Sequence, residues 1–152
     1  MFNNNEINIY DCFEYDRRIM HMMGENATYC SDCKKYCNFS MKTVLTIGPE
    51  ILIIILNRGK GIEFNVKINF VEYLNLANYI QFSNSGVNYQ LIGVITHLGE
   101  SGMSGHFIAY CKNPISNGWF KYNDSNVSQV VNFQSEVINY AIPYLLFYQK
   151  VN

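Results

Sequence analysis

A histidine and an aspartate in the last third of this 152-residue sequence have the spacing of a proton-transfer pair. His106 follows a glycine-rich segment, and Asp124 lies on what reads as the far arm of a β-hairpin whose turn contains Pro114 and Asn117-Gly118. A hairpin turning about Ile115 places His106 directly opposite Asp124, and directly opposed residues have Cβ atoms roughly 4.5–5.5 Å apart. In that arrangement the imidazole Nδ1–H reaches the carboxylate, and Nε2 is left to accept a proton. We therefore predict the base and the orienting group of a nucleophilic hydrolase.

The composition excludes several classes of partner. Hydrophobic residues make up 49% of the chain, charged residues 15%, and the net charge is −1, so no overall field attracts nucleic acid or a charged membrane. The first ten residues lack the pattern of a signal peptide, and the longest apolar run, Ile51 to Leu56, is far too short to span a bilayer. Five cysteines without a secretory signal favour reduced thiols or metal ligation over disulfides. We expect a cytoplasmic or nuclear protein.

Strands dominate the predicted secondary structure. Alternating or continuous apolar runs predict strands at residues 39–47, 50–58, 62–70, 89–98 and 143–151, in addition to the two arms of the hairpin. The segment 50–58 is apolar at every position from Ile51 to Leu56, so we expect it to be a central strand buried on both faces. A turn is expected at 59–61 and a loop at 83–88. Helical spacing is limited to a short helix within 8–24, with Asp11 near its start as a cap, and a turn within 73–80. The expected fold is α+β, mostly β, with one twisted antiparallel sheet and no internal domain boundary.

The motifs around the histidine resemble those of the ubiquitin-specific proteases, which are papain-like cysteine deubiquitinases. The resemblance covers nearly the whole chain, in order. It is carried by Tyr29-Cys30-Ser31-Asp32-Cys33, Ile51 to Arg58, Tyr89-Gln90-Leu91, Val94 to Gly99, Gly105-His106-Phe107, Trp119-Phe120-Lys121-Tyr122-Asn123-Asp124 and Pro143 to Tyr148.

The resemblance implies a thiol protease that cleaves ubiquitin from proteins at the C-terminal glycine of ubiquitin. His106 would be the general base that deprotonates a cysteine, and Asp124 would orient it. The segment from Gly99 to Gly105 would be a mobile loop over the ubiquitin tail. Substrate contacts are expected at Gly99, Ser104, Gly105, Phe107 and Trp119.

Other interpretations of these residues compete with that one. An isolated His and Asp are more often a strand-edge histidine and a turn residue, an interpretation that the full set of motifs makes unfavourable. His97 has no carboxylate at a matching hairpin position, which favours a structural role. Ser104 has no strand-to-helix turn after it and does not fit a nucleophile elbow.

Cys30 and Cys33 form a CxxC pair, which is half of a tetrahedral zinc site. The other half is not evident, although Cys37 could add a third ligand. The two interpretations left open are a structural zinc site and a reduced cysteine pair. Catalysis of this type needs no cofactor.

The sequence departs from the family in one decisive respect. The family's Gly-Asn-Thr-Cys stretch, which supplies the nucleophile and a side chain of the oxyanion hole, has no counterpart around any of the five cysteines. A second departure is Asn57-Arg58-Gly59, where an aromatic residue usually follows the arginine. We expect one partial protease domain over 1–152, with a fingers region over about 1–48, a palm over 49–152, and no helical thumb.

Two functions from different classes follow. The chain is expected to be the C-terminal part of a ubiquitin hydrolase, inactive alone, whose partners are ubiquitin or ubiquitinated proteins and the missing N-terminal part of the domain. The alternative is a catalytically inactive ubiquitin-binding or scaffold module. Without a thumb, apolar surface from Phe107, Ile108 and the central strands should be exposed, so the isolated chain should associate.

Overall fold

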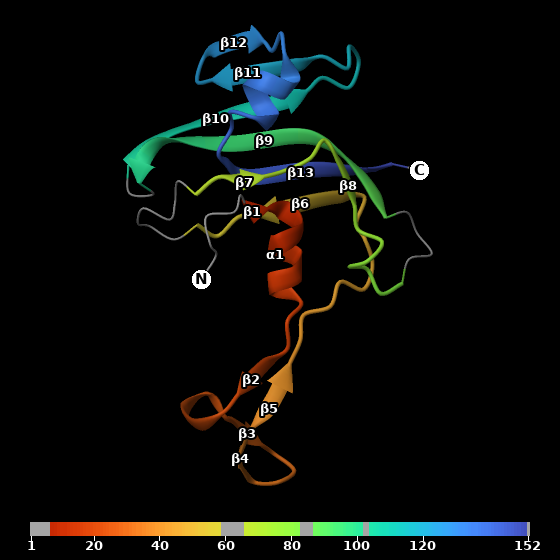
Figure 1. The fold of residues 1–152 in the computed structure, drawn as a ribbon, viewed down its shortest axis with the longest axis vertical. Coiled ribbons are helices and arrows are strands. Elements are labelled where there is room, and N and C mark those ends of the chain that lie inside the picture. Colours follow the sequence, from red (N-terminus) through yellow and green to blue (C-terminus); the bar gives the residue numbers. More distant parts are fainter. Residues whose placement is uncertain (1–6, 59–65, 83–86, 102–103, 152) are drawn as a thin grey trace.

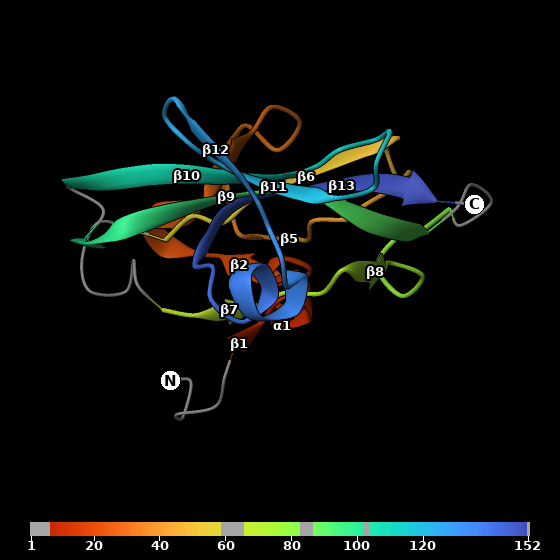
Figure 2. The same ribbon diagram turned by 90° about the horizontal axis from the view of Figure 1, so that it is seen from above.

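One antiparallel sheet of seven strands organises the molecule. The computed structural model describes residues 7–58, 66–82, 87–101 and 104–151. Within them the strand order is β12-β11-β10-β9-β13-β6, and β8 pairs with β9 outside that path. Figures 1 and 2 show the sheet from two directions. Its strands are β6 (Ile51–Ile55), β8 (Tyr73–Asn75), β9 (Asn88–Ser101), β10 (Ser104–Lys112), β11 (Trp119–Asn123), β12 (Asn126–Gln129) and β13 (Pro143–Val151).

The expected mostly-β, antiparallel fold is confirmed, and the strands predicted at 89–98 and 143–151 are both present. β9 is longer than predicted and lies at the centre, because it pairs with β10 on one side and with β13 on the other. A buried threonine secures the start of β13. The Thr96 hydroxyl donates to the Ile142 carbonyl at 2.7 Å and accepts from the Ile142 N–H at 3.0 Å. This places β13 firmly beside the strand that leads to the site.

The prediction that 50–58 forms a central strand buried on both faces is wrong. Among the described strands, β6 pairs only with β13 and is therefore an edge strand. Ile51, Ile53 and Ile55 are 44%, 53% and 67% exposed, whereas Leu52 and Ile54 pack against the core. The error has a simple cause. Because every residue from Ile51 to Leu56 is apolar, the sequence carries no alternation from which the exposed face of the strand could be predicted.

Of two other predicted strands, one is shorter than expected and the other is described only in part. Of the strand predicted at 39–47, only β5 (Phe39–Met41) forms, paired with β2 (Met20–Met22). The predicted turn at 59–61 and residues 62–65 of the next predicted strand lie outside the described residues, as do 83–86 of a predicted loop. Within the described residues 66–70 of that predicted strand, only β7 (Ile68–Asn69) is strand, and it pairs in parallel with β1 (Ile7–Asn8).

Helix α1 (Ile9–Asp16) is shorter than the segment 8–24 in which a helix was predicted. Its N-cap is Asn8, whose side chain accepts from the Tyr10 and Asp11 N–H groups. Asp11 is the third helical residue and accepts the Asn8 N–H at 2.8 Å, which completes a capping box. Asp11 therefore does take part in the cap, from a position three residues beyond the N-cap Asn8.

After α1 the chain leaves the sheet and forms a narrow arm, seen at the bottom of Figure 1. The arm consists of β2, the 3-10 helix η1 (Gly24–Asn26), β3 (Thr28–Cys30), β4 (Lys35–Cys37) and β5. The predicted turn within 73–80 is present after β8, where the Ile80 N–H donates to the Leu76 carbonyl at 3.1 Å.

The core lies between the sheet and the segments on one of its faces. Figure 2 shows α1 and the π-helical turn η3 (Gln134–Ile138) on the same side of the sheet. The largest side chains with almost no exposed surface are Tyr89, Tyr148, Ile9, Leu74, Leu76, Leu91 and Leu146. This packing fixes β9 and β13, and through β9 it fixes the hairpin that carries His106.

Candidate active site

The hairpin of β10 and β11 has a register one residue different from the predicted one. Ala109 lies opposite Tyr122 and Lys112 opposite Trp119, so His106 and Asp124 are not a directly opposed pair. β11 ends at Asn123, which pairs with Asn126 of β12. Asp124 belongs to the tight turn that follows, where its φ of 51° is left-handed. The correction moves Asp124 from a strand to the tip of the next hairpin.

Asn123 makes the shorter contact with His106, a role that the sequence analysis did not assign. The distance from His106 Nε2 to Asn123 Oδ1 is 2.5 Å, and the distance from Nε2 to Asp124 Oδ2 is 3.7 Å. The Asp124 side chain is 79% exposed, compared with 43% for His106. A signal was present in the sequence, because Asn123 stands immediately before Asp124 in the motif from Trp119 to Asp124.

The ring nitrogen that faces these partners is Nε2, whereas the sequence analysis predicted Nδ1. An amide oxygen only accepts hydrogen bonds, so the neutral His106 carries its proton on Nε2 when it donates to Asn123. The lone pair is then on Nδ1. This arrangement leaves Nδ1 as the atom that can take a proton from a reacting group.

A β-bulge at Gly105 sets the direction of the His106 side chain. Ser104 pairs with Ser101 and His106 pairs with Leu98, with a register shift between these two pairs. The φ of Gly105 is 156°, in the range that favours glycine. Because side chains alternate along a strand, a slip of one residue would turn His106 to the other face of the sheet.

The predicted mobile loop at 99–105 is largely strand. Gly99 to Ser101 belong to β9, and Ser104 and Gly105 belong to β10, while residues 102 and 103 lie outside the described residues. Ser104 and Gly105 are exposed beside His106. Their contact with a substrate stays a prediction.

The other two predicted substrate residues lie elsewhere. Phe107 is 51% exposed, but it points to the face opposite His106. Trp119 is only 6% exposed and stacks on Phe133, with ring centroids 4.6 Å apart. These positions give Trp119 a packing role in this structure.

His97 lies on the reverse face of the sheet from His106. It pairs with Phe107, its side chain is on the same face, and the residue is 5% exposed. The His97 and Phe107 rings meet edge to face at 4.8 Å between centroids. This geometry agrees with the structural role that the sequence favoured.

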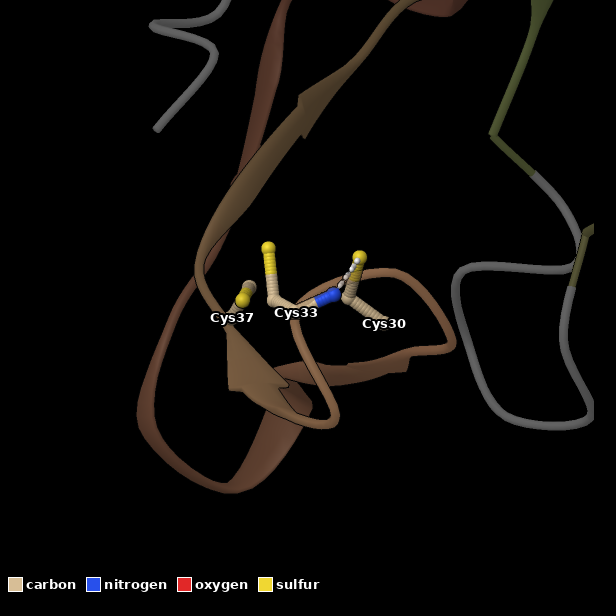
Figure 3. Close-up of side chains that lie close together, drawn as sticks. All are labelled: Cys30, Cys33 and Cys37. Atoms are coloured by element: carbon tan, nitrogen blue, oxygen red, sulfur yellow. Dashed lines mark hydrogen bonds between the residues drawn. The ribbon is translucent and has the colours of Figure 1, made fainter.

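The three cysteines of the arm form a compact cluster at the β3–β4 hairpin (Figure 3). The Sγ atoms of Cys30, Cys33 and Cys37 all lie within 4.8 Å of one another. The Cys33 N–H donates to Cys30 Sγ at 3.4 Å, and this hydrogen bond is the main reason that the pKa of the Cys30 thiol is lowered. Partial burial raises the pKa of Cys37. Three thiols at this spacing could hold a metal ion, and Cys37 lies where it could add the third ligand that the sequence suggested.

Comparison with known proteins places this geometry in a family. Residues 4–148 match the family described as ubiquitin carboxyl-terminal hydrolase. The chain belongs to that family. A relative from Arabidopsis thaliana, ubiquitin carboxyl-terminal hydrolase 16, is 38% identical over 133 residues, which are 84% of this chain and 13% of the relative. Ubiquitin carboxyl-terminal hydrolase Usp2 of Drosophila melanogaster is 31% identical over 133 residues, again 84% of this chain and 14% of the relative.

Solved structures extend the family resemblance to the fold. A chain of the yeast SAGA DUBm with an Sgf73 mutant superposes with a TM-score of 0.76 and 29% identity, over 96% of this chain and 33% of that one. A chain of the SAGA DUB module bound to monoubiquitin gives a TM-score of 0.75 and 28% identity, over 98% and 34%. The chain thus spans about one third of these solved chains and 12% to 18% of the first curated relatives. Among the described residues, no helix is long and apolar enough to cross a membrane.

Proposed function

We propose that this chain supplies the general base of a ubiquitin C-terminal hydrolase. The observation that carries the proposal is the contact of His106 Nε2 with Asn123 at 2.5 Å, with Asp124 at 3.7 Å, because it leaves Nδ1 free to act as a base. Membership of the family supports the substrate class. Asn123 fixes the tautomer and the ring plane, and the Asp124 carboxylate stabilises the imidazolium that forms during the reaction.

The proposed reaction is thiol acyl transfer. A cysteine thiol placed against Nδ1 gives its proton to His106, and the thiolate attacks the carbonyl carbon of the C-terminal glycine of ubiquitin. The imidazolium then gives this proton to the leaving amine as the C–N bond breaks. Water, deprotonated at Nδ1, hydrolyses the thioester and releases the ubiquitin carboxylate and the thiol. His106 returns to its starting state at the end of the cycle.

We propose that the nucleophile is none of the five cysteines of this chain. Cys111 is five residues from His106 on the same strand, which corresponds to the opposite face and roughly 17 Å. Burial raises the pKa of both Cys111 and Cys12, and Cys12 lies in α1 against the core. The other three cysteines lie on the arm, away from β10 (Figure 1).

Reaction with ubiquitin that carries a C-terminal vinyl sulfone tests this placement. We expect no covalent adduct with the 152-residue chain alone, because no thiol adjoins His106. Mass spectrometry of the reaction products is the measurement. An adduct at one of the five cysteines would contradict the proposed origin of the nucleophile.

A second candidate is a ubiquitin-binding module without catalysis, which the positions of the five cysteines favour. The two candidates make the same prediction for the isolated chain and differ for the full natural polypeptide that carries these residues. Hydrolysis by that polypeptide, lost on replacing His106, supports the enzyme. Binding of ubiquitin with no hydrolysis supports the module.

Three further assignments belong to this proposal. The arm would act as the fingers region and the sheet as the palm, with ubiquitin or ubiquitinated proteins as partners. The cluster of Cys30, Cys33 and Cys37 would hold a structural zinc ion that stabilises the hairpin, with a fourth ligand from elsewhere; its three-sulfur donor set supports this choice. The cytoplasm or nucleus is the proposed compartment, which five free cysteines support.

A further inference from the structure

His97 and two glycines form a packed unit on the reverse face of the sheet, directly behind His106. In β9, His97 precedes Leu98, the residue opposite His106, and in β10 its partner Phe107 follows His106. The two histidines therefore occupy adjacent positions in the ladder but point in opposite directions. His97 cannot exchange a proton with a group on the His106 face, so any influence on the reaction must pass through the backbone.

The imidazole of His97 fills the space that side chains at Gly99 and Gly105 would need. A Cβ at Gly99 would lie 2.8 Å from His97 Cε1 and 2.6 Å from the Ser104 carbonyl oxygen. A Cβ at Gly105 would overlap His97 Cε1 and Nε2 and the Leu98 carbonyl oxygen. Both positions therefore need glycine, because a Cβ there would clash with the His97 ring on one side and with the closely approaching β9 and β10 backbones on the other.

Aromatic contacts hold the His97 ring in this position. Phe107 meets it edge to face at 4.8 Å, and Phe107 in turn contacts Tyr144 of β13, with centroids 5.4 Å apart. His97 is 5% exposed although it lies near the end of a long hairpin. The ring is thus fixed between the glycines and a column of aromatic side chains that reaches the next strand.

We propose that His97 is a positioning residue for His106. The His97 ring packs against the Gly105 bulge on the reverse face of the sheet and keeps the bulge in one conformation. The bulge in turn sets the register that directs His106 toward Asn123. Removal of the ring leaves a void under a bulge whose glycine has few conformational restrictions, so the His106 side chain loses its single orientation. This inference rests on the proposed function only in treating His106 as a base. The orientation of the His106 side chain by His97 does not depend on that function.

The tautomer of His106 is the direct readout of its positioning. The chain has three histidines, so a ¹⁵N spectrum of the imidazoles is simple to assign by replacing each in turn. For the wild-type chain we expect His106 to carry its proton on Nε2, as the contact with Asn123 requires. His97→Ala should convert this single tautomer into a mixture. His97→Gln, which keeps a flat polar side chain of similar size, should retain the wild-type tautomer.

A glycine pair provides the matched control. Gly105→Ala forces a Cβ against the His97 ring and should disturb His106 in the same way as His97→Ala. Gly93→Ala is on the same strand as His97, but its Cβ would meet its nearest neighbours at 3.5–3.6 Å, which is ordinary contact. It should leave His106 unchanged. Amide spectra establish that each variant is folded. If His97→Ala does not fold, the inference is tested by comparing the His106 tautomer in Gly105→Ala with that in Gly93→Ala.

An unchanged His106 tautomer in folded His97→Ala, or in folded Gly105→Ala, would overturn the inference. Kinetics on the full natural polypeptide separate it from the proposed function. There, His97→Ala should lower kcat on the order of 10- to 100-fold with KM little changed, because the base is misplaced and not removed. Wild-type protein without any hydrolytic activity would defeat the proposed function while leaving the tautomer result intact.

Discussion

At the scale of single residues, the site depends on which nitrogen of His106 is held. The sequence indicates the pair of His106 and Asp124 but leaves out Asn123, because a register error of one residue cannot be detected from turn residues alone. In the structure Asn123 makes the close contact, and Asp124 is an exposed charge at the tip of a turn. Asn123 and Asp124 should therefore contribute unequally to the rate of hydrolysis.

Replacing the two partners one at a time measures this inequality. Asn123→Ala removes the acceptor that fixes the tautomer, and we expect it to lower kcat on the order of 10²-fold in the full natural polypeptide. Asp124→Ala removes an exposed carboxylate, whose interaction with the protonated His106 is worth about 0–1 kcal/mol and so no more than about fivefold. Steady-state hydrolysis of a fluorogenic ubiquitin amide is the measurement. A larger loss for Asp124→Ala than for Asn123→Ala would contradict the assignment.

At the scale of elements, local sequence patterns predicted that a strand forms better than they predicted where it lies in the sheet. The strand at 143–151 is present with the predicted bounds, because Pro143 marks its start and this signal is local in the sequence. The strand at 50–58 was assigned to the centre of the sheet, although β6 lies at an edge. The neighbours of a strand depend on the order of the whole sheet, and a run of isoleucines carries no information about that order.

The β3–β4 hairpin yields a prediction at the same scale. If Cys30, Cys33 and Cys37 together hold zinc, added zinc should slow the alkylation of these three thiols by iodoacetamide. Cys111, which lies on β10 outside the cluster, serves as the control within the same molecule. Peptide mapping by mass spectrometry gives each rate, and Cys37→Ser should weaken the protection of the other two. Equal rates with and without zinc at all four cysteines would refute the zinc assignment.

At the scale of the whole molecule, one edge of the sheet exposes an apolar face. The isoleucines of this face are Ile51, Ile53 and Ile55, on a strand with one paired edge in the described residues. The sequence predicted exposed apolar surface at Phe107, at Ile108 and on the central strands, which is right for Phe107 and wrong for Ile108, since Ile108 is 2% exposed. An apolar edge strand of this kind promotes association between chains.

We therefore expect the isolated chain to self-associate as its concentration rises. Ile53→Lys places a charge in the middle of the exposed face and should shift the distribution toward monomer in sedimentation velocity. Val131→Lys adds the same charge at a residue that is 91% exposed elsewhere, and should not. A wild-type chain that remains monomeric at all concentrations would show that this face does not mediate self-association.

The central claim is that His106 is the base of a ubiquitin hydrolase. Its most direct test is the hydrolysis of a fluorogenic ubiquitin C-terminal amide by the full natural polypeptide, with His106→Gln compared with His21→Gln. His21 is exposed on the arm, where its Nδ1 lies 2.9 Å from Ser40 Oγ, and serves as the control. We predict a loss of about 10²- to 10⁴-fold in kcat for His106→Gln, the range that general base catalysis supplies, and no change for His21→Gln. Activity of His106→Gln within twofold of wild type would contradict the claim.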